Sequence, residues 1–353
     1  MKVLHLSYNV ASQISVSVRA LRAIGVQARG LIIPSQGDFI QSHDYLEILP
    51  DAPGHPWSMP WIRHRTHHYA AFLTAIAWAD VLHWHYGHLA LGRGLDLRWA
   101  RLLRRAGVAE FWGSDIRIGS VEAADNPYFA AHAPPEYRAQ QTLQRSIETQ
   151  APFARAGFSC LVPDGAMLSY VQRNLFPAIH LVRQRVFVAD YAPCPPDPHK
   201  RPLIVHSPSD PKLKGSEFVL AAVEKLRADH DFDFRLIQGV PRAEALAVLG
   251  EADIFVDQLI LGSHGLASIE AMALAKPVIC YIKPPLLSTY PSDLPIVNAN
   301  PETITEVLRG LITNGRRRYE LGVQGRAYAE RYHDAVVIAG GLRDIYRGLP
   351  ERS

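Results

Sequence analysis

The chain has 353 residues, of which 48% are hydrophobic and 20% are charged, and its formal net charge is +3. This length is enough for two domains of ordinary size, and the composition is that of a globular protein. The small positive charge fits an anionic ligand or an anionic membrane surface, and it is too small to indicate a nucleic-acid-binding protein.

The cysteines and the distribution of apolar residues indicate where in the cell the protein is expected to reside. Cys160, Cys194 and Cys280 are far apart and form no C-x-x-C pair, which predicts reduced thiols rather than a disulfide framework. No run approaches the roughly 18 apolar residues that a membrane-spanning helix needs. Residues 1–7 resemble a first strand whose apolar part is too short for a signal peptide. We therefore expect a cytoplasmic protein, with contact to the inner face of the membrane left open.

Short apolar runs alternate with helical periodicity throughout the first half, which favours parallel strands joined by crossover helices. The expected strands are 3–6, 28–33, 81–84, 109–112 and 160–162. The expected helices are 12–23, 64–77, 95–105 (ended by Gly107), 136–149 and 164–174.

Residues 191–202 hold five prolines, which disfavour both helix and central strand and predict a stiff linker. After this segment the alternation restarts. The expected strands are 203–206, 234–237, 254–256 and 278–282, and the expected helices are 242–249, 267–275, one that starts at Ser216 and one that Asn300 caps. A helical tail over 316–347 is expected to bend near His333. The sequence thus predicts an α/β protein with two doubly wound parallel sheets.

The most informative segment follows the strand at 254–256. Its loop contains Gly262, Ser263, His264 and Gly265, and a helix-forming run then extends from Ala267 to Ala275. A small-residue loop that opens a helix presents backbone N–H groups at the positive end of the helix dipole. This pattern predicts a phosphate site, with Glu270 placed to reach a ribose hydroxyl. The alternative is an ordinary strand–loop–helix with no ligand.

This segment resembles the donor-nucleotide site of GT-B glycosyltransferases, in particular the retaining glycosyltransferase family 4. The matching residues are Gly265-Leu266, Glu270-Ala271-Met272-Ala273 and Lys276-Pro277-Val278-Ile279. Gly262 stands where the family has a glutamate that touches the donor sugar, and His264 stands at an aromatic position. The resemblance implies two Rossmann-like domains facing a cleft. The expected boundaries are 1–192 for the first domain, 193–202 for the linker, 203–333 for the donor domain and 334–353 for a helix that crosses back.

A second loop, within 206–215, contains Ser209, Lys212 and Lys214. The family has an arginine and then Lys-Gly here, two cations that neutralise the donor diphosphate. Lys214 matches the lysine, Ser209 stands at the arginine position, and Lys212 is a further cation that cannot make a bidentate contact. Both loops follow strands of one sheet at their carboxyl ends, where open α/β sheets bind ligands. We expect them to hold the diphosphate without a metal ion; a solvated pair of surface lysines is the alternative.

The first half offers candidates for the sugar or acceptor side. Related enzymes have His-Gly-Ser-Asp where this chain has Trp112-Gly113-Ser114-Asp115. The resemblance implies a catalytic or orienting role for Asp115, an orienting role for Arg117, and a sugar-stacking role for Trp112. A turn closed by Asp115 is the alternative. Asn9, after the first strand, is also placed to line the cleft.

A strand that ends in His83-Trp84-His85 matches a His-x-His of related sequences. Alternation places His83 and His85 on one face and Trp84 on the other. The resemblance implies that His85 contacts a sugar or acceptor and takes part in catalysis. A core histidine is the alternative, and we expect no metal site, because spacing supplies no third ligand.

The helix expected at 95–105 contains four arginines with one acid, Asp96, and an apolar stripe. A basic amphipathic helix can dock on an anionic bilayer. The alternative is a crossover helix whose stripe is core and whose arginines are solvated.

The resemblance implies a metal-independent glycosyltransferase of the hexosyltransferase type, acting with retention in glycan, glycolipid or polysaccharide biosynthesis. Its partners would be a nucleoside-diphosphate sugar and a saccharide, lipid-linked or small-molecule acceptor, and no nucleic acid. The alternatives are a catalytically degenerate sugar-nucleotide-binding protein, a sugar-nucleotide epimerase or a phosphorylase. No G-x-G-x-x-G follows a strand, so a dinucleotide-dependent oxidoreductase is not expected. The base, the sugar and the acceptor are not fixed by the sequence.

Overall fold

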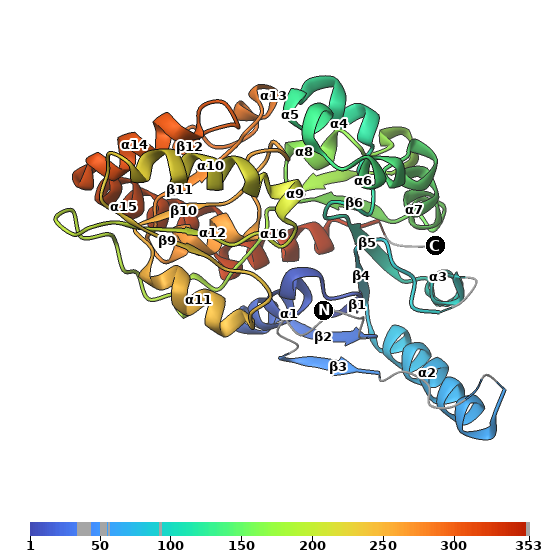
Figure 1. Cartoon of the computed structure of the whole chain (residues 1–353). Helices are drawn as coiled ribbons and strands as arrows, with labels where there is room; N and C mark the ends of the chain where they lie inside the picture. Colours follow the sequence, from blue (N-terminus) through green and yellow to red (C-terminus); the bar gives the residue numbers. More distant parts are fainter. Residues whose placement is uncertain (34–43, 50–54, 56, 92–93, 351–353) are drawn as a thin grey trace. The chain divides into compact units, whose positions relative to one another are not determined.

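The computed structural model describes residues 1–33, 44–49, 55, 57–91 and 94–350, and these form two compact units (Figure 1). The first unit comprises Met1–Arg117, Leu143–Arg185 and Ala335–Ser353, and the second comprises Ile118–Thr142 and Val186–Asp334. Neither unit is a continuous stretch of chain.

The first unit is built on a seven-stranded parallel sheet with the order β3-β2-β1-β4-β5-β6-β7. Its strands are β1 (Lys2–Ser7), β2 (Gln27–Ile32), β3 (Leu46–Ile48), β4 (Val81–His85), β5 (Ala106–Glu110), β6 (Ser159–Val162) and β7 (Ile179–Leu181). The order runs outward from β1 in both directions, as in a doubly wound sheet. The central strands are buried on both faces, which explains why most of their residues are apolar.

The helices of the first unit are α1 (Gln13–Ala23), α2 (Met59–Trp78), α3 (Leu95–Leu102), α7 (Leu143–Arg155), α8 (Gly165–Leu168) and α16 (Ala335–Arg347), with 3₁₀ turns η1 (Val10–Ser12) and η4 (Arg173–Leu175). Helix α1 packs against β2 and α16. The prediction that Gly107 ends a helix is wrong, because Gly107 lies inside β5. A Cβ there would lie 2.9 Å from the Leu82 carbonyl oxygen and 2.8 Å from the Phe158 ring, so close strand packing requires the glycine.

The second unit is built on a five-stranded parallel sheet with the order β12-β11-β10-β8-β9. Its strands are β8 (Leu203–His206), β9 (Asp233–Leu236), β10 (Ile254–Val256), β11 (Val278–Cys280) and β12 (Val297–Asn298). Its helices are α4 (Gly119–Asp125), α5 (Pro127–His132), α6 (Pro135–Gln140), α9 (Pro211–Lys214), α10 (Ser216–Arg227), α11 (Arg242–Glu251), α12 (Leu266–Ala273), α13 (Pro284–Leu287), α14 (Ile304–Thr313) and α15 (Gly315–Tyr332), with η5 (Val188–Asp190). Apolar residues of β8, β10, α10 and α14 form one buried core. The predicted α/β class with parallel sheets is confirmed.

The segment Ile118–Thr142 belongs to the second unit, although the sequence places it in the expected first domain 1–192. The Asn126 side-chain amide donates a hydrogen bond to the Ile260 carbonyl over 2.8 Å. The buried Lys283 ammonium pairs with Glu122 at 2.8 Å and Asp125 at 2.6 Å. These contacts fasten α4 and α5 to the loops that follow β10 and β11.

The expected bend near His333 is confirmed, because α15 ends at Tyr332 and α16 begins at Ala335. The His333 carbonyl accepts a hydrogen bond from the Val186 N–H over 3.0 Å. The helix that follows the bend belongs to the first unit, where Leu342 and Tyr346 are buried. Among the described residues, no helix combines the length and the apolar character that crossing a membrane requires.

Candidate functional site

Two loops meet at the carboxyl edge of the second sheet, after the neighbouring parallel strands β8 and β10. Asp257, the residue directly after β10, joins them. Its Oδ1 lies 2.6 Å from the Lys214 Nζ, and its Oδ2 accepts hydrogen bonds from the Gly265 N–H at 3.1 Å and the Ser268 hydroxyl at 2.6 Å. The structure therefore brings together two predicted residues, Lys214 and Gly265, through a carboxylate that the sequence analysis did not select.

The Asp257 side chain is fully buried, whereas 13% of the Lys214 side chain remains exposed. Burial opposes the ionisation of Asp257, but the Lys214 charge and the hydrogen bonds from Lys214, Ser268 and Gly265 outweigh it and hold the pKa of Asp257 below its usual range. Of this ion pair, only the lysine side chain is partly exposed.

Gly265 directly precedes α12, and its Cα lies beside the Lys214–Asp257 pair. A Cβ on Gly265 would lie 3.6 Å from the Lys214 Nζ and 3.5 Å from the Asp257 Oδ2, so the lysine rests directly on the loop. Residues Leu266–Ser268 supply the first N–H groups of α12, the groups that a helix leaves without intrahelical partners. One ammonium and one helix N-terminus at the same sheet edge form an arrangement suited to a phosphate.

Glu270, also on α12, is held by two residues from elsewhere in the unit. Its Oε1 lies 2.6 Å from the Arg242 Nη2 and accepts a hydrogen bond of 3.0 Å from the Tyr191 hydroxyl. Arg242 donates a further hydrogen bond to the same hydroxyl, and its side chain is 33% exposed. One oxygen of the carboxylate is thereby fixed in place, which leaves the other oxygen as the acceptor for a ligand hydroxyl.

The remaining residues predicted for the donor loops differ in exposure. Ser209, which precedes α9, and Lys212, which lies within it, are both exposed, and the Asp210 side chain caps the first turn of this helix. Ser263 is partly buried, and its carbonyl accepts a hydrogen bond from the Gln258 amide. His264 is buried, with its ring 5.0 Å from Tyr290 and 5.6 Å from His333.

The structure explains why position 262 is a glycine, where the family that this segment resembles has a glutamate. Its φ is +73°, a conformation that side chains rarely adopt. A Cβ there would lie 2.9 Å from the Asn126 amide nitrogen and 3.1 Å from the aliphatic chain of Lys283. The segment α4–α5 has therefore closed the space that a side chain at this position would need.

In the first unit, Asp115 closes the turn after β5. Its carboxylate accepts hydrogen bonds from the backbone N–H groups of Trp112, Gly113 and Ile116, at 2.7 to 3.2 Å. Burial raises the pKa of Asp115 to about 6, against the lowering effect of these hydrogen bonds. Burial raises the pKa of Asp164, and the positive charge of the nearby Arg117 partly opposes this rise. This geometry matches the alternative in which Asp115 closes a turn.

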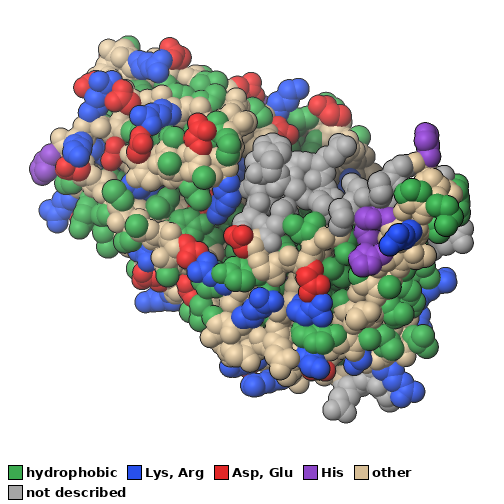
Figure 2. Space-filling model, turned by 90° about the horizontal axis from the view of Figure 1, so that it is seen from below, with side chains coloured by type: hydrophobic (Ala, Val, Ile, Leu, Met, Phe, Trp, Pro, Cys, Tyr) green, Lys and Arg blue, Asp and Glu red, His purple; other side chains and the backbone are tan. Residues whose placement is uncertain are grey.

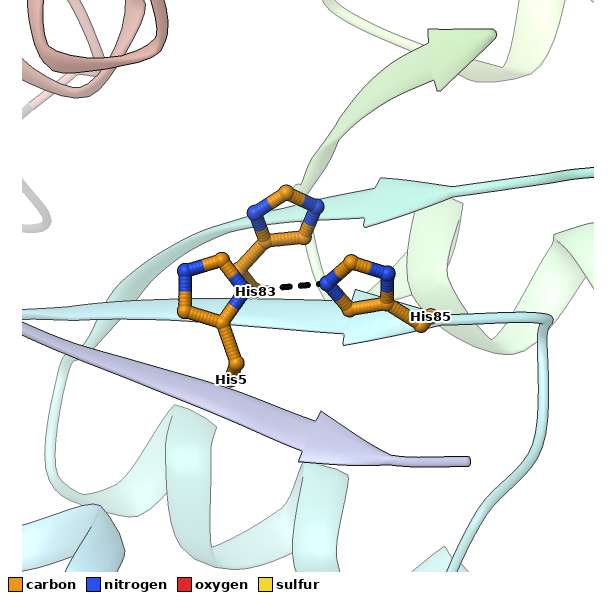
Figure 3. A group of neighbouring side chains, drawn as sticks. All are labelled: His5, His83 and His85. Atoms are coloured by element: carbon orange, nitrogen blue, oxygen red, sulfur yellow. Dashed lines mark hydrogen bonds between the residues drawn. The ribbon is translucent and has the colours of Figure 1, made fainter. Parts of the chain in front are cut away.

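Three histidines of the first unit lie together inside the protein, as Figure 3 shows. His83 and His85 share one face of β4 as predicted, and their rings stack with centroids 4.3 Å apart. The Nδ1 of His5 lies 2.9 Å from the Nε2 of His85, and the Nδ1 of His83 lies 2.7 Å from the Tyr346 hydroxyl. Because His85 is fully buried, its position disagrees with the expectation that it faces a sugar or acceptor.

A buried ion pair adjoins the three histidines. The Arg185 guanidinium binds both oxygens of Glu110, at 2.9 and 2.7 Å, and the second oxygen also lies 3.0 Å from the His83 Nε2. Trp112 is buried here, with its ring stacked 6.0 Å from His85 and the Arg185 guanidinium 5.4 Å away. These contacts cover Trp112 and leave little exposed ring surface for the sugar stacking expected from the resemblance.

Burial is the largest influence on the histidine charges and lowers the pKa of all three, most strongly for His5 and His85. Burial also opposes the ionisation of Glu110, but Arg185 and His83 hold its pKa at about 2. Neutral imidazoles can bind a metal, and one nitrogen of each ring lies within 4.8 Å of the others. The charged Arg185 beside them raises the cost of a further buried cation.

Asn9 has a local role. Its Oδ1 accepts hydrogen bonds from the N–H groups of Ile14 at 3.0 Å and Ser15 at 3.4 Å, at the start of α1. The helix expected to start at Ser12 is therefore capped by a side chain three residues before that position.

Two residues of the candidate site, Asp257 and Arg242, were not selected from the sequence. Asp257 could have been recognised as a charged residue directly after a buried strand, and Arg242 as a cation at the start of a helix.

Comparison with known proteins rests on structure, because no protein-family model and no curated protein matches the chain. Sucrose-phosphate synthase from Thermosynechococcus elongatus is similar at a TM-score of 0.66 and 14% identity, covering 98% of both chains. HepE from Anabaena, solved with UDP, is similar at 0.60 and 12%, covering 99% of this chain and 100% of that chain. An alpha-glucosyltransferase solved with UDP-glucose and DNA is similar at 0.65 and 9%, covering 98% of both. The chain has the GT-B fold. At these identities the likeness shows the fold alone.

Proposed function

We propose that this protein is a metal-independent glycosyltransferase that moves a sugar from a nucleoside-diphosphate sugar to an acceptor hydroxyl. The observation that carries the proposal is the Asp257 bridge, which sets Lys214 beside the N-terminus of α12 at the carboxyl edge of a GT-B sheet. A preorganised cation and helix dipole can stabilise the negative charge that develops on a leaving diphosphate.

The nucleotide we propose is UDP. HepE has been solved with UDP and with UDP-glucose, and the alpha-glucosyltransferase with UDP-glucose. In this chain the diphosphate would contact Lys214 and the amides that open α12, and a ribose hydroxyl would donate to Glu270. Ser209 and Lys212 would border the diphosphate from the exposed side of α9. Retention would follow if the leaving phosphate accepted the proton of the acceptor hydroxyl, a route that needs no separate protein base.

A second candidate is a protein that binds the nucleotide without sugar transfer. Two observations favour it: the Asp115 carboxylate is occupied by backbone N–H groups, and Gly262 has no room for a side chain. Neither position then supplies a polar group to the sugar. Binding without turnover would be the expected behaviour of this candidate.

The first test is thermal unfolding of the full chain with UDP, GDP, ADP, CDP and TDP, each with and without Mg²⁺. A ligand at 100 times its dissociation constant should stabilise the folded protein by about 2.7 kcal/mol. We expect UDP to do so without Mg²⁺. The response should fall in Glu270→Ala and persist in Glu224→Ala, which removes an exposed glutamate of the same unit. Stabilisation by no nucleotide would contradict both candidates.

The second test separates the two candidates. UDP-glucose is incubated with the protein, and free UDP is measured with water alone and with a panel of saccharide and lipid-linked acceptors. Acceptor-dependent UDP release supports transfer. UDP binding with no release on any acceptor favours the binding protein.

A further inference from the structure

Helix α2 of the first unit is only half packed. Its buried side chains are His68, Phe72, Ala75 and Ile76, and none of them lies in the first nine residues of the helix. The first half begins with an N-cap, because the Ser58 hydroxyl accepts a hydrogen bond from the Trp61 N–H and Pro60 occupies the first turn. Figure 1 shows the first turns of α2 extending away from the strands of the same unit. The sequence thus maintains a helix that its own unit does not bury.

The outer face of this helix is uncharged along its length and is apolar except at Thr66. Met59, Ile62, Thr66, Ala70, Leu73 and Ala77 recur every three or four residues, and all of them are exposed. At the helix start, 80% of Trp57 and 76% of Met59 are exposed. An exposed, largely apolar stripe of this kind indicates a surface that binds a membrane or another molecule.

The exposed charged side chains of α2 and of the neighbouring α3 have a single sign. Residues 57–79 contain no aspartate or glutamate, but they contain Arg63 and Arg65. The neighbouring α3 adds Arg98 and Arg101, and its one acid, Asp96, is buried against the backbone N–H groups of Ala90, Leu91 and Leu97. Figure 2 shows histidine and basic side chains beside hydrophobic ones at the end of the molecule where α2 lies. The surface is therefore complementary to an anionic partner.

Aromatic side chains are concentrated at the same end. The Trp57 and Trp61 rings lie 5.4 Å apart, and the Arg65 guanidinium lies 5.6 Å from Trp61 and 5.4 Å from Tyr69. Tryptophan and tyrosine favour the headgroup level of a bilayer, where one part of the ring is in an apolar phase and the other in water.

We propose that α2 is a docking helix for an anionic lipid bilayer, lying in the interface with Trp57, Met59 and Ile62 in the acyl boundary and the arginines on acidic headgroups. The occupant is a bilayer rather than a second copy of the chain, because two copies of this acid-free face would set arginine against arginine. This inference does not depend on the proposed transfer activity.

The surface differs from the one expected at 95–105. Helix α3 buries Leu97 and Ala100, and its Trp99 packs edge-on against Tyr69 of α2. Of the stripe expected from the sequence, Leu95, Trp99 and Leu103 are partly buried and Leu102 is 78% exposed. Helix α3 supplies charge to the docking surface, and α2 supplies the apolar stripe.

The test is sedimentation of the full-length protein with vesicles of phosphatidylcholine alone and of phosphatidylcholine with about 30% phosphatidylglycerol, an acidic lipid, at low and high salt. We expect binding to the anionic vesicles only, weakened by salt. A variant with Trp57→Ser, Met59→Ser and Ile62→Ser should bind at least tenfold more weakly. Arg63→Glu with Arg65→Glu should lose the preference for anionic vesicles. Leu287→Ser, a change at an exposed leucine of the second unit, is the matched control and should bind as the unchanged protein does.

Each variant is first checked for unchanged thermal unfolding, which the exposure of these side chains predicts. Two results would overturn the proposal. One is equal or absent binding to both kinds of vesicle. The other is a concentration-dependent dimer that the triple variant dissociates, since this would assign the stripe to a second copy of the chain.

Discussion

Both units place charged and polar side chains at or near the carboxyl ends of parallel strands, but they treat these groups differently. In the first unit Glu110, Arg185 and the histidines have no exposed side-chain surface. In the second unit the Asp257–Lys214 and Glu270–Arg242 pairs each keep one cation partly exposed. A closed network presents no exposed group to a ligand in solution, whereas a half-open one can exchange a partner for a ligand. The comparison supports the proposal that a ligand binds in the second unit, and it predicts that the first cluster contributes mainly to stability.

The largest expected effect comes from breaking the closed network. Arg185→Ala leaves Glu110 as an uncompensated buried charge and should destabilise the first unit by about 3–5 kcal/mol, as measured by urea unfolding. The matched control is Arg29→Ala, which breaks the exposed Arg29–Glu47 pair of the same unit and should cost less than about 1 kcal/mol. Similar costs for the two changes would remove the distinction between a closed network and a surface pair.

Breaking the half-open pair should affect activity more than stability. We expect Lys214→Ala to raise the barrier of UDP-glucose turnover by roughly 2–4 kcal/mol, because the leaving diphosphate loses its cation. If Asp257 acts through Lys214, Asp257→Asn should also slow turnover, and the two changes should be non-additive by roughly 0.5–3 kcal/mol in a double-mutant cycle. Strict additivity would mean that Asp257 has a separate role.

Glu270→Ala should weaken UDP binding by roughly 1–3 kcal/mol in calorimetric titration, since it leaves a ribose hydroxyl and Arg242 with one partner fewer. Arg242→Ala should have a smaller effect, because it removes a residue that only positions the carboxylate. Unchanged affinity in Glu270→Ala would place the ribose elsewhere in the second unit.

The smallest effect concerns pH. Burial holds the pKa of His5 and His85 well below 6.5, so the unfolded chain binds protons below pH 6.5 and the folded chain does not. Their contribution to stability is therefore complete above pH 6.5 and is lost as the pH falls. From pH 7.5 to 6.5 the loss should be on the order of 1 kcal/mol for the two groups together, by urea unfolding. His206, whose pKa is lowered to about 4 in the second unit, provides the control: His206→Gln should keep most of this dependence.

The buried strands of the second unit could be predicted from the sequence. Strands 203–206 and 254–256 were predicted with their observed bounds, because a strand buried on both faces is a continuous apolar run. The edge strands β3, β7 and β12 were not predicted, since they are two or three residues long and their side chains are partly exposed. The helix expected at 136–149 is in fact two helices, α6 and α7, because the Gln141 carbonyl turns aside to accept the Gly119 N–H.

The site could be predicted only where a local pattern marked it. Lys214 and Gly265 belong to recognisable loops, and Glu270 follows at a fixed spacing. Their partners were not predictable in this way, because Asp257 pairs across 43 positions and Tyr191 across 79. The burial of His85 and Trp112 also depends on Arg185, a residue distant in sequence. Pairing across such separations is a property of the folded chain rather than of residue spacing.

The helix α16 lies after the whole second unit in the chain, yet it supplies Tyr346 to His83 of the first sheet, 263 positions earlier. During synthesis on the ribosome, β1 to β7 therefore emerge well before the helix that covers them. While the second unit is being translated, the first unit still lacks the buried side chains of Leu342 and Tyr346. A nascent chain stopped before Ala335 would contain a finished second unit and an uncovered first one, which makes that interval the period when a chaperone has most reason to bind.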